Sequence, residues 1–199
     1  MCERKELKQK AVNGVLWTSI QKFASAFMTL VSEMFLARLL MPYDFGCIEM
    51  LAIFMLLAET LVSGGFGSAL IQKKQPVPED YSTVFVWNMG VSIMVYFALW
   101  MTAPVIAQFY SIPQLCSILR VQGLILFIHA FNIVQLSQLR KQLRFKEIAT
   151  ASIVASIISL FITIVMAYSG FGVWALVSKN LIFAFIVLII TYIIEISTF

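Results

Sequence analysis

Six long apolar runs occupy most of this sequence, and each is close to the length that an α-helix needs to cross a lipid bilayer. A bilayer core about 30 Å thick is spanned by roughly 20 helical residues. The runs are continuous, whereas the strands of a membrane β-barrel are short segments of alternating polarity. We therefore predict an all-α, polytopic membrane protein with six helical spans, at about 14–36, 46–63, 84–109, 115–136, 149–169 and 173–194.

Composition excludes several other classes of protein. Of the 199 residues, 61% are apolar and 12% are charged, whereas an average soluble domain is about half apolar and roughly a quarter charged. The net charge of +4 is too small to indicate a nucleic-acid partner. The three cysteines and the single histidine have no spacing typical of a disulfide framework or a zinc site. We therefore expect no metal, no cofactor and no catalytic residues.

Positive residues gather on one side of the predicted spans. Because cytoplasmic segments carry an excess of Lys and Arg, this asymmetry predicts that both termini are cytoplasmic. The connecting segments of the opposite side contain only Arg38. The ten positive residues of the cytoplasmic side are Arg4, Lys5, Lys8, Lys10, Lys73, Lys74, Arg140, Lys141, Arg144 and Lys146.

The segment 137–148 combines leucines at helical spacing with four positive side chains, Arg140, Lys141, Arg144 and Lys146. This pattern predicts an interfacial basic helix that forms an elbow at the membrane surface. Its positive side chains would attract anionic lipid headgroups. The alternative is that these residues only determine the topology.

A polar stripe runs along the first predicted span. Lys22, Ser25, Thr29 and Glu33 recur at spacings of three and four residues, which places them on one face of a helix. Charged residues inside a membrane usually face protein or water, so the stripe predicts the wall of a substrate cavity. The alternative is that Lys22 extends to the membrane surface and that the hydroxyl groups bond within helix contacts.

Polar residues in the other spans are further candidates. We predict that Asn88, Arg120 and Lys179 contribute to the cavity, Lys179 by binding an anion, although Lys179 and Arg120 could instead reach the membrane surface. For ion coupling the intramembrane candidates are Glu49, Glu59 and His129. A histidine at mid-span also has the alternative role of a buried hydrogen-bonding group.

Five segments are similar, in their order and spacing, to segments of the Wzx-type polysaccharide flippases. They are 14–17, 36–46, 65–74, 139–146 and 170–177. The resemblance implies a bacterial inner-membrane protein of the multidrug/oligosaccharidyl-lipid/polysaccharide exporter superfamily. Such a protein moves oligosaccharide linked to undecaprenyl pyrophosphate from the cytoplasmic to the periplasmic leaflet.

The same resemblance implies two lobes of helices around a central cavity. The six predicted spans resemble the first lobe alone, so residues 1–199 are interpreted as one lobe of a truncated or half-length form. Its expected partners are membrane lipids, the lipid-linked oligosaccharide, and a second transmembrane half or a second copy. In this hypothesis Lys22, then Lys179 and Arg120, neutralise the pyrophosphate.

Two other functions remain open from the sequence. A drug or cation exporter of the same superfamily would share the bundle, but its cationic substrates suit three intramembrane positive residues poorly. A membrane-embedded polyprenyl-phosphate or glycosyl transferase would need clustered acidic residues on a loop. Glu79 and Asp80 are adjacent acids, but beside two prolines they indicate a solvated loop.

Overall fold

The computed structural model of the chain describes residues 2–64 and 78–196, with side chains described for residues 13–64, 79–194 and 196. The positive side chains of the N-terminus lie outside these residues. So do Lys73, Lys74 and the 65–74 segment on which part of the family resemblance depends.

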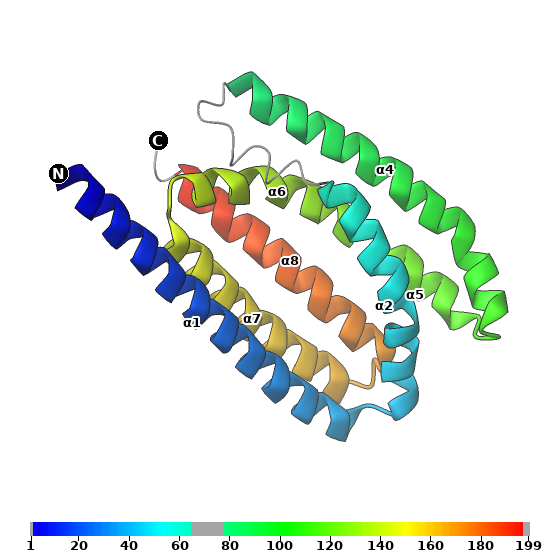
Figure 1. Ribbon diagram of the computed structural model, residues 1–199. Coiled ribbons are helices and arrows are strands. Elements are labelled where there is room, and N and C mark those ends of the chain that lie inside the picture. Colours follow the sequence, from blue (N-terminus) through cyan, green and yellow to red (C-terminus); the bar gives the residue numbers. More distant parts are fainter. Residues whose placement is uncertain (1, 65–77, 197–199) are drawn as a thin grey trace.

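All regular structure in the described residues is helical, as the sequence predicts (Figure 1). α5 and α6 form one rod that is interrupted at Gly123 and Leu124. The helices are α1 (Cys2–Leu39), α2 (Pro42–Ser63), α4 (Pro78–Phe109), α5 (Gln114–Gln122), α6 (Ile125–Lys141), α7 (Phe145–Tyr168) and α8 (Val173–Ile196).

Five of the helical rods in the described residues are long and apolar enough to cross a bilayer: α2, α4, α5–α6, α7 and α8. The chain is therefore a multi-pass membrane protein. α1 is the longest helix, with 38 residues, but its charged and hydroxyl-bearing side chains make it less apolar than the others. That residues 14–36 cross the membrane stays a prediction.

Residues 137–148 do not form a separate interfacial helix, which corrects the predicted elbow. α6 continues through Lys141, and the chain reverses at Leu143, whose φ of 58° lies in the left-handed region. α7 begins at Phe145. Leu139 continues the register of α6 and is only 4% exposed, so the leucine spacing reflects packing within the bundle. We call the end of the bundle that carries this turn the basic end.

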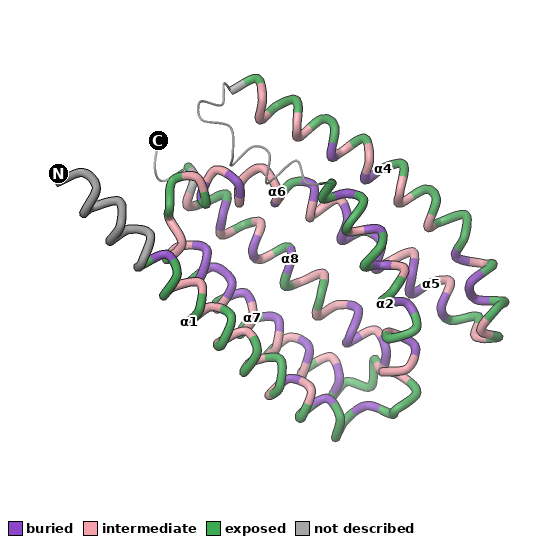
Figure 2. Tube along the Cα trace, in the orientation of Figure 1, coloured by how far each residue is buried: buried purple, intermediate pink, exposed green. Residues whose placement is uncertain are grey.

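The helices form a bundle in which α1 and α4 lie at opposite edges (Figure 1). α1 packs along α7, α7 along α8, and α8 against α6, which contacts α4 and α2. Figure 2 shows exposed residues on the outward sides of α1 and α4, and buried residues on the helices between them. The apolar outer surface is what lipid contact requires of a membrane bundle.

Small side chains let α7 approach its neighbours closely. Ala151, Ala155, Ser159 and Thr163 of α7 are buried, and small residues at such spacing allow helix backbones to come near each other. The hydroxyl of Thr163 donates to the carbonyl of Ser159 within the same helix, at 2.6 Å. These small buried residues therefore pack α7 against its neighbours.

Two segments of the family resemblance, 36–46 and 170–177, meet at the end of the bundle opposite to the basic end. The carboxylate of Asp44 accepts a hydrogen bond from the backbone N–H of Met41 at 3.1 Å and so caps the start of α2. Gly172, whose φ is 53°, brings the α7–α8 turn against that carboxylate. Beneath this contact, Leu36 and Leu176 belong to one buried cluster. These two segments of the sequence resemblance are thus in contact in the fold.

Gly14→Ala is expected to lower the thermal unfolding midpoint of the protein. A Cβ atom at position 14 would lie 2.7 Å from a ring carbon of Phe145, so the ring of Phe145 would have to move. Overpacking of this kind costs about 1–3 kcal/mol. The midpoint is measured in detergent by tryptophan fluorescence.

Gly90→Ala is the matched control, because a Cβ at position 90 of α4 meets nothing within 4 Å. Alanine stabilises a helix by about 1 kcal/mol relative to glycine, so this variant should keep or raise the midpoint. A similar change for the two variants would contradict the close approach of α1 to Phe145.

Candidate functional site

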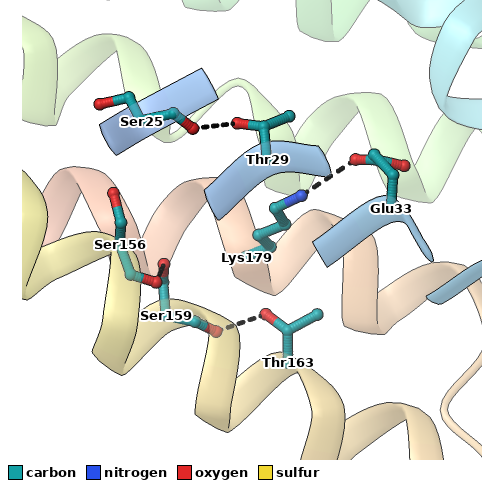
Figure 3. Close-up of polar contacts among 7 residues, drawn as sticks. All are labelled: Ser25, Thr29, Glu33, Ser156, Ser159, Thr163 and Lys179. Carbon is teal, nitrogen blue, oxygen red and sulfur yellow. Dashed lines mark hydrogen bonds and ion pairs between the residues drawn. The ribbon is translucent and has the colours of Figure 1, made fainter. Parts of the chain in front are cut away.

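A pocket of about 180 Å³ opens between α1, α7 and α8, and we call it the lysine pocket. Figure 3 shows polar side chains of the three helices converging at this place. The polar residues in its lining are Ser25, Thr29, Ser32, Ser156, Ser159, Lys179 and Asn180. The polar stripe of α1 thus faces the hydroxyl groups of Ser156 and Ser159 on α7.

Lys179 and Glu33 form an ion pair at the lysine pocket (Figure 3). The ammonium nitrogen of Lys179 lies 3.1 Å from Oε1 of Glu33, and the two side chains are 20% and 46% exposed. The pair joins α8 to α1 over a separation of 146 residues. A charge inside a bilayer is strongly disfavoured unless it is paired or solvated, so each residue accounts for the presence of the other.

Most hydroxyl groups around this pair donate to carbonyls of their own helix. Thr29 donates to Ser25, and Ser159 donates to Ser156. Ser32 differs: its side chain is only 2% exposed, and its oxygen has no hydrogen-bond partner among the described residues. A buried polar group without a partner costs about 1–3 kcal/mol, so the pocket holds an unused hydrogen-bonding site next to the lysine.

A second pocket, of about 610 Å³, lies between α1, α2, α6, α7 and α8 towards the basic end, and we call it the histidine pocket. The two pockets share Phe183 in their linings. Gln21 of α1 closes one side by donating to the hydroxyl of Ser152 at 2.8 Å. The other polar lining residues include Glu59, His129, Asn132, Ser137 and Arg140.

The histidine pocket brings together two of the three candidates for ion coupling. Glu59 of α2 and His129 of α6 both line it. Asn132, one turn after His129, donates to the carbonyl of Ala184, while its Oδ1 is buried without a partner among the described residues. Glu49 is exposed on α2 and belongs to neither pocket. The structure therefore separates Glu49 from the other two candidates.

Three residues predicted for the cavity lie elsewhere. Lys22 is exposed and lines a separate depression of about 340 Å³ with Leu143 and Phe145. Arg120 lies over the ring of Trp100 on α4, with 4.1 Å between the guanidinium carbon and the ring centre. Asn88 is fully buried in α4 and lines neither pocket. The hypothesis that Lys22, Lys179 and Arg120 share one cavity is thus corrected: of these three, the lysine pocket contains Lys179.

The positive residues of the basic end have specific contacts. Arg144 forms an ion pair with Glu147 at 2.8 Å, and the ammonium of Lys146 lies 5.7 Å from the ring centre of Trp17 on α1. Arg140 lines the histidine pocket. The Lys146 contact therefore joins α7 to α1, and the Arg144 pair lies at the start of α7.

Gln21, Asn132 and Asn180 line the two pockets but were not among the predicted site residues. Each is uncharged, so the cost of a charge inside the bilayer, which identifies the other candidates, does not identify it. The helical spacing of Gln21, Ser25 and Ser32 would have been a usable signal, because it places all three on one face of α1.

Residues 35–196 match the family described as "Polysaccharide biosynthesis protein". The chain belongs to this polysaccharide biosynthesis family. The match runs from the end of α1 through α8, so it includes Lys179, Glu59 and His129. The resemblance inferred from the sequence is confirmed.

Three curated relatives resemble the chain at low identity. It is 24% identical over 173 residues to the succinoglycan biosynthesis transport protein ExoT of Rhizobium meliloti, which covers 87% of this chain and 35% of that protein. It is 25% identical to the lipopolysaccharide biosynthesis protein WzxC of Escherichia coli, over 81% of this chain and 33% of that protein. Identity to the teichuronic acid biosynthesis protein TuaB of Bacillus subtilis is 23%, over 77% and 32%.

The chain spans about a third of the length of these relatives of the polysaccharide biosynthesis family. No solved structure matches it. Membership of the family and the multi-pass helical fold thus apply to this chain.

Thr29→Cys is expected to react with a membrane-impermeant maleimide in a lipid bilayer, because Thr29 lies at the lysine pocket and polar walls hold water there. Phe27→Cys is the matched control. It differs in depth by about 3 Å and lies about 200° around α1, where its exposed side chain faces outward. Both variants are made after the three native cysteines are replaced by alanine. Equal labelling of the two cysteines would contradict a hydrated groove on one side of α1.

Proposed function

We propose that this protein is one lobe of a transporter that moves lipid-linked oligosaccharide across the bacterial inner membrane. The observation that carries the proposal is a pair of polar pockets inside a bundle whose outer surface is apolar. The naming of its relatives for biosynthesis of surface polysaccharides, and in one case for transport, supports the choice of substrate. In this proposal no covalent bond is made or broken.

The substrate has three chemically different parts, and each matches a different environment. The polyprenyl chain is apolar and stays in the bilayer. Sugar hydroxyls need hydrogen-bonding groups, which the histidine pocket offers through its amides and hydroxyls. The pyrophosphate needs positive charge, and Lys179 supplies it from a largely buried position, where the attraction is stronger than in bulk water.

Lys179 takes the first place among the proposed substrate-binding residues, because it lies in a pocket with hydroxyl groups. Lys22, Thr29 and Glu33 lie along one flank of α1, and in the proposal this flank borders the path of the substrate. Arg120 and Asn88 are assigned to helix packing, Arg120 through its contact with Trp100.

The open flank of α1 also bears on assembly. Lys22 and Thr29 are exposed, and Glu33 is partly so. Lipid cannot solvate such groups, so we propose that a second transmembrane half or a second copy of the chain covers them and encloses water. This is consistent with relatives about three times as long as the matched region.

For orientation, we propose that the basic end and both termini face the cytoplasm, according to the excess of positive residues there. Arg140, Lys141, Arg144 and Lys146 would then lie at the depth of the anionic headgroups of the inner leaflet, where each contributes about 1 kcal/mol to membrane attraction.

Transport is tested with the purified chain in proteoliposomes that contain a fluorescent polyprenyl-pyrophosphate disaccharide. Movement between leaflets exposes the probe of the inner leaflet to a membrane-impermeant quencher. With the wild type, we expect the quencher to remove more fluorescence than the probe of the outer leaflet contributes. Lys179→Met should slow this loss about tenfold, because the pyrophosphate loses its counter-charge.

Arg38→Met is the control, since Arg38 is exposed at the far end of α1 and outside both pockets; it should behave as the wild type does. Accumulation of a hydrophobic cationic dye without movement of the disaccharide probe would favour a drug exporter. Absence of movement of either compound would contradict transport by this chain without a second half.

Glu59 and His129 are proposed as the groups that couple transport to an ion gradient, because they face a common pocket inside the bundle. An imposed pH gradient across the same proteoliposomes should accelerate probe movement by the wild type. Glu59→Gln should lose this response, and Glu49→Gln, an equal change of charge on the exposed side of the same helix, should keep it. Loss of the response in the Glu49 variant alone would overturn the assignment.

A further inference from the structure

We propose that the Lys179–Glu33 ion pair is a latch that a phosphate-bearing lipid headgroup opens by replacing Glu33 as the partner of Lys179. The inference rests on the proposed function and assigns opposite effects to the two residues. Lys179 attracts the headgroup, and Glu33 competes with it.

The first argument is that the anion-binding groups of the lysine pocket are only partly used. Lys179 can donate three hydrogen bonds, and one goes to Glu33. Ser32 is 2% exposed, lines the same pocket, and its oxygen has no partner among the described residues. The amide of Asn180 also lines the pocket. These groups together offer donors of the kind that a phosphate oxygen accepts.

The second argument is size. The lysine pocket measures about 180 Å³, and one water molecule takes about 30 Å³ of liquid. The pocket therefore has room for a group of several heavy atoms, such as a phosphate, but is too small for a sugar chain. The larger histidine pocket lies beyond Phe183, which both linings share.

The third argument identifies Glu33 as the partner that leaves. Its side chain is 46% exposed, whereas that of Lys179 is 20% exposed. On release, the Glu33 carboxylate can be solvated at the open flank of α1, but Lys179 would remain in the pocket and needs another anion. No proton has to be transferred, because the ammonium keeps its charge and exchanges one carboxylate oxygen for a phosphate oxygen.

The exchange also loosens the bundle at a defined place. α1 packs chiefly against α7, and the Lys179–Glu33 contact joins it directly to α8. When a headgroup replaces Glu33, this tie is lost while the α1–α7 contact stays. Binding of the headgroup thereby frees the edge of α1 that borders the lysine pocket.

The test measures affinity for sugar-free polyprenyl pyrophosphate by the chain in nanodiscs of uncharged lipid. Lys179→Met should weaken binding about tenfold, and Lys179→Arg should retain most of it. Glu33→Gln should strengthen binding about fivefold, since a competing ion pair of this exposure is removed. Glu33→Ala is a second variant, with the same expected direction, in case the amide forms its own bond to Lys179.

Glu49→Gln is the matched control, because it changes the net charge equally but outside the pocket; its affinity should equal that of the wild type. Weaker binding by both Glu33 variants would overturn the latch and make Glu33 a positioning residue for Lys179. Equal strengthening in the Glu33 and Glu49 variants would overturn it too, because the effect would be one of net charge.

Two further arms identify the ligand and separate this inference from the proposed function. Inorganic pyrophosphate and phosphatidic acid should both compete with the lipid, because the phosphate group is what the pocket is proposed to recognise. Failure of both compounds to compete would overturn a phosphate site at Lys179. If the Glu33 variants bind more tightly while the disaccharide probe is not transported, the latch stands and the transport proposal fails.

Discussion

The lack of water in a bilayer core is the constraint on which this structure depends. In that medium each backbone group must find its hydrogen bond within the protein, which leaves only helices for the long apolar runs. The same medium disfavours every charge that is neither paired nor solvated. Glu33 and Lys179 solve the problem by pairing, Arg120 by lying over an aromatic ring, and the Glu59 and His129 side chains by sharing a polar pocket.

The helical fold could be predicted from the sequence because apolar length and turn residues act locally. The last predicted span begins at the same residue as α8, Val173, after a turn that contains Gly170 and Gly172. The turn between α6 and α7 could not be predicted from the sequence of residues 137–148. Its leucine spacing fits both a surface helix and the continuation of α6, and only tertiary packing of Leu139 distinguishes the two.

The candidate site was predictable along each helix but not between helices. Spacing alone places Ser25, Thr29 and Glu33 on one face of α1. It does not indicate that Glu33 meets Lys179, because the two are separated by 146 residues and several helices could have provided the partner. The contact of Arg120 with another helix could not be predicted from spacing either. As an intramembrane charge it suggested a cavity, but its guanidinium lies over the ring of Trp100 on the neighbouring helix.

The ion pair between α1 and α8 has a consequence for the synthesis of the protein. Chains emerge from the ribosome at about 5–20 residues per second, and Lys179 follows Glu33 by 146 residues. Lys179, the counter-charge of Glu33, is therefore synthesised on the order of 10 to 30 s after it. During that interval α2, α4 and α5–α6 are synthesised before α7 and α8, two helices that α1 contacts. Glu33 gains its counter-charge only when α8 has been synthesised.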